Sequence, residues 1–230
     1  MCNKQSYVLF YKPPDKEQFE HSSQAMQPCA MTTSVHWQNT NFQLSVADAK
    51  QFPDTHLPQV AVAGHSNVGK SSLLNTLFGR KGLVKTSKNP GCTRLLNLFE
   101  VDDKILVVDL PGYGYARASK VEKYKWAGLI ENYLKSPKVA QLVLVLLDFR
   151  HGPKDSDLQL IDWLNESGIR WQPVATKSDK LKGNAKRKRK QEMIDALGGM
   201  LEPILTSSLK NEGMQELRKV IIQEMLANND

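Results

Sequence analysis

One eight-residue stretch, Gly64–Ser71 with the sequence GHSNVGKS, constrains this chain more than any other. It lies directly between an apolar run, residues 59–64, and a segment with helically spaced leucines, residues 70–78. It matches the pattern G-x-x-x-x-G-K-[ST], in which backbone N–H groups wrap phosphates at a helix N-terminus. The pattern predicts that Lys70 contacts the β- and γ-phosphates of a nucleotide and that Ser71 binds Mg²⁺. The alternative reading is a glycine-rich turn without a ligand.

Short apolar runs alternate with helical patterns after this point, which predicts an α/β fold with a mostly parallel sheet and helices on both faces. We expect six strands, one of them antiparallel, because residues 95–101 and 104–109 are joined only by the turn at Asp102–Asp103. The expected strands are 59–64, 95–101, 104–109, 141–148, 171–177 and 203–208. The expected helices are 70–78, 121–136, 156–168, 184–199 and 213–226.

Further short motifs each follow a predicted strand, where ligands of parallel sheets bind. In DLPG, Asp109 would hold a metal through water and the Gly112 N–H would contact a γ-phosphate. In TKSD, the Asp179 carboxylate would accept hydrogen bonds from guanine N1–H and its 2-amino group, while the Lys177 stem would cover the base. Taken alone, Asp179 would be interpreted first as a helix N-cap. The backbone N–H groups of TSSLK, Thr206–Lys210, would meet guanine O6.

Thr93 lies in the segment NPGCTRLLN, 23 residues after Lys70, and its hydroxyl suits Mg²⁺. A surface threonine after a Pro-Gly turn is the alternative. One strong motif and four weak ones in this order predict a Ras-like P-loop GTPase fold. An ATP-dependent kinase acting on a small substrate and a membrane-remodelling GTPase are the other classes considered. Asp179 argues against the first, and no amphipathic lipid-binding segment supports the second.

The segments GHSNVGKSSLLNTL, TSKNPGCTRLLNLFEV, VDLPGYGYA, DFRHGPKDSDLQLIDWL, TKSDKL and SSLKNEG together resemble the EngB-type (YihA/YsxC) bacterial GTPases. The resemblance runs from about Asn41 to the C-terminus. It implies GTP, GDP and Mg²⁺ binding, a role in large ribosomal subunit assembly, and a link to septation in cell division. It makes Ser71 and Thr93 the Mg²⁺ ligands and Lys70 and Thr93 catalytic residues. The implied nucleotide contacts are Gly64, His65, Ser66, Asn67, Val68, Gly69, Lys70, Ser71, Gly91, Cys92, Thr93, Arg94, Leu95, Asp109, Leu110, Pro111, Gly112, Thr176, Lys177, Ser178, Asp179, Thr206, Ser207 and Ser208.

Two positions depart from the family, His65 and Cys92, where the family usually has basic residues. A third feature concerns catalysis, because Tyr113 stands where many P-loop GTPases place a glutamine that orients the attacking water. Slow hydrolysis is therefore expected. By resemblance, Asn67 is a candidate K⁺ ligand that would supply positive charge. Alternatively, Asn67 simply suits the backbone conformation of the loop.

The net charge of +7 arises from 31 basic and 24 acidic residues. Seven of the cations lie in Lys180–Lys190, a segment without acidic residues, so the whole excess is local. Local basic patches favour phosphate-rich partners, and we expect this segment to contact ribosomal RNA. A solvated surface helix is the alternative.

Residues 1–31 are polar and proline-punctuated and are expected to be a disordered tail, with the GTPase domain spanning 32–230. Cys2, Cys29 and Cys92 are scattered, which suggests a reducing, cytoplasmic location. The longest apolar run, LVLVLL, is far shorter than the ~20 residues of a membrane helix, so no membrane association is expected. Nothing in the sequence suggests a large apolar interface, and a monomer is expected.

Overall fold

The computed structural model describes residues 34–48, 51–85, 95–113, 128–135 and 142–226. Residues Thr33–Asp230 form one compact unit. The predicted tail, residues 1–31, lies outside the described residues, so its disorder stays a prediction.

The core of the fold is a mixed sheet that has seven strands within the described residues, one more than predicted. Its spatial order is β1-β3-β4-β2-β5-β6-β7, and β2, β4, β5, β6 and β7 run parallel. The strands are β1 (Thr40–Val46), β2 (Gln59–Gly64), β3 (Leu96–Val101), β4 (Ile105–Asp109), β5 (Leu142–Asp148), β6 (Trp171–Thr176) and β7 (Ile204–Leu205).

The additional strand is β1, an edge strand that pairs antiparallel with β3. Since β3 is also antiparallel to β4, it is the one strand that runs against the others, as predicted. The sequence pattern missed β1 because this strand buries little of its own apolar surface. Phe42 is 49% exposed and lies against Phe99 of β3, with ring centroids 5.6 Å apart.

The turn between β3 and β4 is one residue longer than predicted, because Val101 pairs with Ile105 and residues 102–104 form the connection. Asp102 and Asp103 have left-handed φ values of 54° and 53°, and the N–H of Lys104 donates to the carbonyl of Val101 at 3.0 Å. The predicted strand over residues 171–177 also forms, although it contains Pro173. Its neighbour β7 is only two residues long and pairs with Val174 and Ala175. Pro173 therefore lies in the part of β6 that β7 leaves unpaired.

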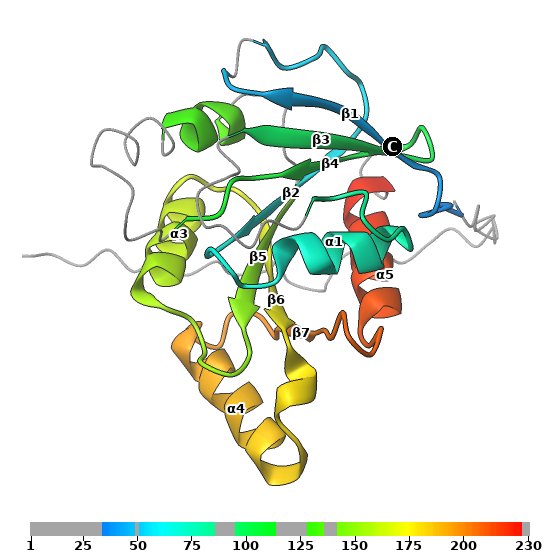
Figure 1. The fold of residues 1–230 in the computed structure, drawn as a ribbon. Coiled ribbons are helices and arrows are strands. Elements are labelled where there is room, and N and C mark those ends of the chain that lie inside the picture. Colours follow the sequence, from blue (N-terminus) through cyan, green and yellow to red (C-terminus); the bar gives the residue numbers. More distant parts are fainter. Residues whose placement is uncertain (1–33, 49–50, 86–94, 114–127, 136–141, 227–230) are drawn as a thin grey trace, which may run out of the picture. The chain divides into compact units, whose positions relative to one another are not determined.

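Helices cover both faces of the sheet, as predicted (Figure 1). On one face lie α1 (Lys70–Phe78) and α5 (Met214–Leu226), and on the other lie α3 (Asp155–Glu166), α4 (Gly183–Ala196) and the helical residues 128–134. The rest of the helix predicted over 121–136 lies largely outside the described residues. None of the helices that can be described is long and apolar enough to span a bilayer.

The central strand β2 is buried along its whole length, because helices pack against both of its faces. Val60 and Val62 contact the layer of α1 and α5, whereas Ala61 and Ala63 contact the opposite layer. Gly64 is the last residue of this strand and is itself buried. Packing therefore fixes the position at which the following loop begins.

The C-terminus of α1 is held by one side chain of α5. The Nε of Arg218 donates to the carbonyl of Leu77 at 3.0 Å, and an Nη donates to the carbonyl of Thr76 at 3.5 Å. The same guanidinium lies over the ring of Trp37 at 5.7 Å from its centroid. A cation at a helix C-terminus complements both the unpaired carbonyls and the helix dipole.

Replacing Arg218 by alanine should lower the free energy of unfolding by about 2 kcal/mol, because hydrogen bonds from a charged group to helix carbonyls are lost. Urea unfolding followed by circular dichroism measures this change. Lys219→Ala, at the next and exposed position of α5, is the matched control and should unfold like the unmodified protein. Equal stability of the two variants would contradict the capping role.

Candidate functional site

The motifs singled out in the sequence meet at one edge of the sheet. β2, β4, β5 and β6 are parallel, so their carboxyl ends lie side by side. The loop Gly64–Ser71 follows β2, Asp109 ends β4, Asp148 ends β5, and Thr176 ends β6. The hydrogen bonds described below join these segments directly.

The loop from Gly64 into α1 has a conformation that demands small residues at two points. A Cβ at Gly64 would lie 2.9 Å from Val68 Cγ1 and 3.0 Å from Leu146 Cβ, too close for any side chain. Gly69 has a φ of 108°, which only glycine adopts readily. Gly69 is also the N-cap of α1 and makes no side-chain cap, so the first N–H groups of α1 are available to an anion.

Lys70 and Asp109 form a buried ion pair across the loop. Lys70 is 9% exposed and Asp109 is 2% exposed. The amide of Asn97, on β3, also donates to the other oxygen of Asp109 at 3.5 Å. Ser71 follows Lys70 in the first turn of α1 and is half-buried. Sequence reasoning placed Lys70 and Asp109 in one site but missed Asn97, which lies two residues after Leu95 in the largely apolar strand β3.

The segment after Asp109 lies directly against the loop Gly64–Ser71. The N–H of Ser66 donates to the carbonyl of Tyr113 at 2.9 Å, and the N–H of Tyr113 donates to the carbonyl of Gly64 at 3.3 Å. Between them, a Cβ at Gly112 would lie 3.3 Å from both Cα and Oγ of Ser66. Glycine at position 112 therefore allows the two backbones to approach.

The side chain of Tyr113 lies in the protein core rather than in the site. It is 7% exposed and packs edge-on to the ring of His65, with centroids 6.1 Å apart. Its hydroxyl interacts with the carboxyl of Asp157 in the first turn of α3, and burial together with Asp157 raises the pKa of Tyr113. Sequence reasoning missed Asp157, whose only signal was an acidic residue near a helix start.

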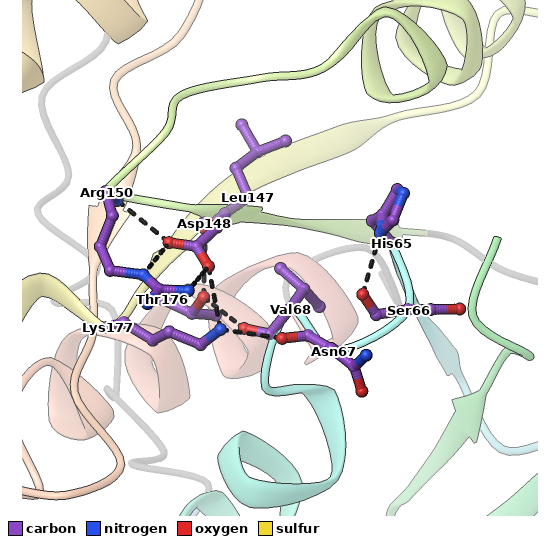
Figure 2. Close-up of polar contacts among 9 residues, drawn as sticks. All are labelled: His65, Ser66, Asn67, Val68, Leu147, Asp148, Arg150, Thr176 and Lys177. Atoms are coloured by element: carbon purple, nitrogen blue, oxygen red, sulfur yellow. Dashed lines mark hydrogen bonds and ion pairs between the residues drawn. The ribbon is translucent and has the colours of Figure 1, made fainter. Parts of the chain in front are cut away.

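The segment Thr176–Asp179 is tied to the loop after β2 by two side chains (Figure 2). The hydroxyl of Thr176 donates to the carbonyl of Val68 at 2.7 Å. The Nζ of Lys177 donates to the carbonyl of Asn67 at 2.8 Å. Both Asn67 and Lys177 adopt left-handed backbone conformations, with φ values of 66° and 59°. The side chain of Asn67 is exposed at the loop.

Asp179 is held in place by the last of the predicted motifs. The Oγ of Ser207 donates to Oδ1 of Asp179 at 2.7 Å, and the N–H of Ser178 donates to the carbonyl of Thr206 at 3.0 Å. The hydrogen bond from Ser207 is the largest cause of the lowered pKa of Asp179. The N–H of Lys210 donates to the same Oγ at 3.2 Å. The segment 206–208, which carries little signal alone, thus orients the carboxylate.

The remaining predicted residues fall into two groups. His65, Leu110, Pro111 and Ser208 lie within the segments already described, and Leu95 lies immediately before β3. Gly91, Cys92, Thr93 and Arg94 lie outside the described residues, so their predicted roles stay predictions.

The basic segment forms most of α4 (Figure 1), which begins four residues after Asp179 in the chain. The sequence suggested no acidic partners for its cations, but several of them form ion pairs with glutamates outside the segment. Arg189 pairs with Glu192 at 2.8 Å and Lys190 with Glu202 at 2.7 Å. Within the described residues, Lys186 and Arg187 make no ion pair, so part of the helix keeps an uncompensated positive charge.

Comparison with known proteins identifies the family. The model of the family described as "50S ribosome-binding GTPase" matches residues 59–177. A Desulfosudis oleivorans protein named "Probable GTP-binding protein EngB" is 43% identical over 176 residues, covering 76% of this chain and 89% of the relative. A Streptococcus pneumoniae protein of the same name is 41% identical over 199 residues, covering 85% of this chain and 100% of the relative.

Solved structures agree. The Era protein of Aquifex aeolicus bound to GDP and AlF₄⁻ is 25% identical with a TM-score of 0.61, covering 74% of this chain and 57% of that chain. A crystal structure of a "probable GTP-binding protein engB" has a TM-score of 0.59 at 20% identity, covering 74% of this chain and all of that chain, and supports the fold. The chain therefore belongs to the EngB family of GTP-binding proteins, P-loop enzymes that hydrolyse GTP.

Proposed function

We propose that this GTPase is a slow molecular switch that acts on the large ribosomal subunit during its assembly. The observation that carries the proposal is the meeting of a phosphate-binding loop, Asp109 and Asp179 at one sheet edge, beside the basic helix α4. We further propose that the protein is a cytoplasmic monomer that cycles between GTP-bound and GDP-bound forms. Its loss would disturb septation.

The phosphates of the nucleotide would bind at the start of α1. The N–H groups of Asn67 to Ser71 and the dipole of α1 favour negative charge there. Lys70 would exchange its partner Asp109 for the β- and γ-phosphates, with its ammonium held near its final position by the buried carboxylate. The N–H of Gly112 would read the γ-phosphate from the opposite side.

The residues around Asp109 also suit Mg²⁺, which prefers oxygen ligands and keeps several waters. Asp109 offers a buried carboxylate beside Lys70, close to the first turn of α1. Ser71 and Thr93 would bind the ion through their hydroxyls, and Asp109 would hold it through water. When bound, Mg²⁺ neutralises charge on the phosphates.

The base would bind between Lys177 and the segment 206–208. The Asp179 carboxylate, oriented by Ser207, would accept hydrogen bonds from N1–H and the 2-amino group of guanine. Adenine offers no such donor pair and would leave a carboxylate without partners, a costly outcome in a desolvated site.

Asp179→Asn should weaken GDP binding by at least about 100-fold, because an amide replaces one acceptor with a donor that faces the 2-amino group. The same variant should gain affinity for xanthosine diphosphate, whose carbonyl at position 2 accepts from that amide. Fluorescent-nucleotide titration measures both affinities. Asp155→Asn, on the exposed start of α3, is the control and should bind GDP normally. Unchanged GDP binding by Asp179→Asn, or displacement of GDP by ATP, would refute the base-recognition proposal.

Hydrolysis would be slow because Tyr113 leaves the water without the glutamine that orients it in other GTPases. Its side chain is fixed in the core between Asp157 and the ring of His65, and it carries no amide that could orient a water. Positive charge from outside would then complete the site. Asn67 offers an exposed side-chain amide at the phosphate loop, and we propose that it binds K⁺ there.

GTP turnover should be faster in KCl than in NaCl at equal ionic strength, by about tenfold for one added charge contact. Asn67→Gly keeps the left-handed backbone that the loop requires but removes the amide, so it should abolish the difference between the two salts. Phosphate release assays give the rates. Equal rates of the unmodified protein in both salts would eliminate the K⁺ site.

Charge and the relatives both support a ribosomal partner. The matching family is described as 50S ribosome-binding, and Era has been solved with MgGDPNP and nucleotides 1506–1542 of 16S ribosomal RNA, at 25% identity to this chain. On α4, Lys186 and Arg187 remain available for phosphates, and contact with RNA phosphates is largely independent of sequence. We place the ribosomal RNA contact on the segment Lys180–Lys190.

Replacing Lys186 and Arg187 together by glutamine should weaken co-sedimentation with large ribosomal subunits about tenfold at low salt and flatten its salt dependence. GDP affinity should stay unchanged, since neither residue contacts the nucleotide site. Arg170→Gln with Lys219→Gln removes the same charge elsewhere and serves as the control. Sedimentation in GDP, GTP and a non-hydrolysable analogue tests the switch. Loss of ribosome binding in both double variants alike would show that only net charge matters.

A further inference from the structure

The carboxylate of Asp148, at the end of β5, joins two cations beside the nucleotide site (Figure 2). Arg150 donates from Nε at 2.9 Å and from an Nη at 2.7 Å, one bond to each oxygen, and its own N–H donates at 3.1 Å. Lys177 donates from Nζ to Oδ2 at 2.9 Å. Partial burial alone would raise the pKa of Asp148, but the bonds from Arg150 and Lys177 hold it well below its usual range.

Lys177 connects this carboxylate to the phosphate loop. Its Nζ makes two hydrogen bonds, one to Asp148 at 2.9 Å and one to the carbonyl of Asn67 at 2.8 Å. Figure 2 shows the Lys177 side chain lying across the gap between these two groups. A chain of hydrogen bonds therefore runs from Arg150 through Asp148 and Lys177 to the proposed phosphate-binding loop.

The environment makes this arrangement more than a surface ion pair. The side chain of Asp148 is 11% exposed and that of Lys177 is 27% exposed, so solvent screens them only in part. A lysine stem has four rotatable carbons and its ammonium is a point charge without preferred direction. Without a fixed anion, nothing among the described residues other than the Asn67 carbonyl would hold the Lys177 ammonium over the loop.

We propose that Asp148 is a positioning residue of the GTP site: held by Arg150, it fixes the Lys177 ammonium against the Asn67 carbonyl and so keeps the base-covering stem and the phosphate loop together. Nucleotide release then requires Lys177 to leave an anion as well as the base. The proposal rests on the nucleotide contacts proposed above and is independent of ribosome docking.

A purely structural role is the competing explanation, because the carbonyl of Asp148 also accepts from the N–H groups of His151 and Gly152, at 3.1 and 3.0 Å. These are backbone bonds, which Asp148→Asn leaves in place. A structural role predicts lower stability with no special dependence on Lys177. A positioning role predicts that the effects of changing Asp148 and Lys177 overlap.

The test is a double-mutant cycle on the rate of GDP dissociation, followed with a fluorescent GDP. Asp148→Asn should accelerate release about tenfold, because it removes the charge that holds Lys177. Lys177→Met should accelerate release at least about tenfold, because it removes this charge-assisted bond and also the bond to the Asn67 carbonyl. The double variant should release GDP no faster than Lys177→Met alone, since Asp148 acts through Lys177. An unchanged rate in Asp148→Asn, or a double variant about tenfold faster than Lys177→Met, would overturn the proposal.

Asp102 supplies the matched control, because it too is an aspartate whose pKa is held low, by the His36 N–H first and then by Lys104 and Asn39. It lies in the turn at the far end of β4 from Asp109. Asp102→Asn should release GDP within about twofold of the unmodified rate.

If circular dichroism shows that Asp148→Asn does not fold, Arg150→Gln replaces it in the test. That variant should release GDP about threefold faster, because it loosens the carboxylate while leaving the Lys177 bond. An unmodified release rate in Arg150→Gln would then refute the proposal. Failure of the unmodified protein to bind GDP would instead refute the nucleotide site itself.

Discussion

The parallel pairing of β2 with β4 on one side and β5 on the other is the constraint on which the site depends. It places the last residues of three buried strands, Gly64, Asp109 and Asp148, at one edge and in fixed register. Gly64 is pressed against Leu146 so closely that no side chain fits there. The loop Gly64–Ser71 therefore starts from a rigid point. The position of the sheet thus determines where the N–H groups of the loop point.

Two halves of the site are organised by different forces. Around the proposed phosphate site the backbone dominates, with glycines, a helix N-terminus and one buried ion pair between Lys70 and Asp109. Around the proposed base site side chains dominate, because Ser207 is hydrogen-bonded to Asp179 and Asp148 to Lys177. Lys177 is the residue that belongs to both halves, since its ammonium reaches the carbonyl of Asn67.

The sequence predicts what depends on periodicity and on fixed local spacing. It located the loop at Lys70 and the turn at Asp102, because a helix start and a tight hairpin turn have local signatures. It missed β1, whose Phe42 is exposed at the sheet edge and gives no alternating pattern of burial. It also gave no role to Asp157 or Asp148, because Tyr113 and Lys177, which they contact, are distant in sequence and only the fold brings them together.

The contacts of Tyr113 affect the neighbouring Gly112 N–H, the proposed contact of the γ-phosphate. Its backbone is hydrogen-bonded to Gly64 and Ser66, and its ring is anchored in the core with the hydroxyl at Asp157. The peptide of the preceding residue, Gly112, is therefore held from one side by two independent attachments. The proposed phosphate contact of the Gly112 N–H is thus pre-organised, and little ordering entropy would be lost at this point on binding. The same attachments leave no mobile catalytic side chain at this position, because Tyr113 is held by both its backbone and its ring.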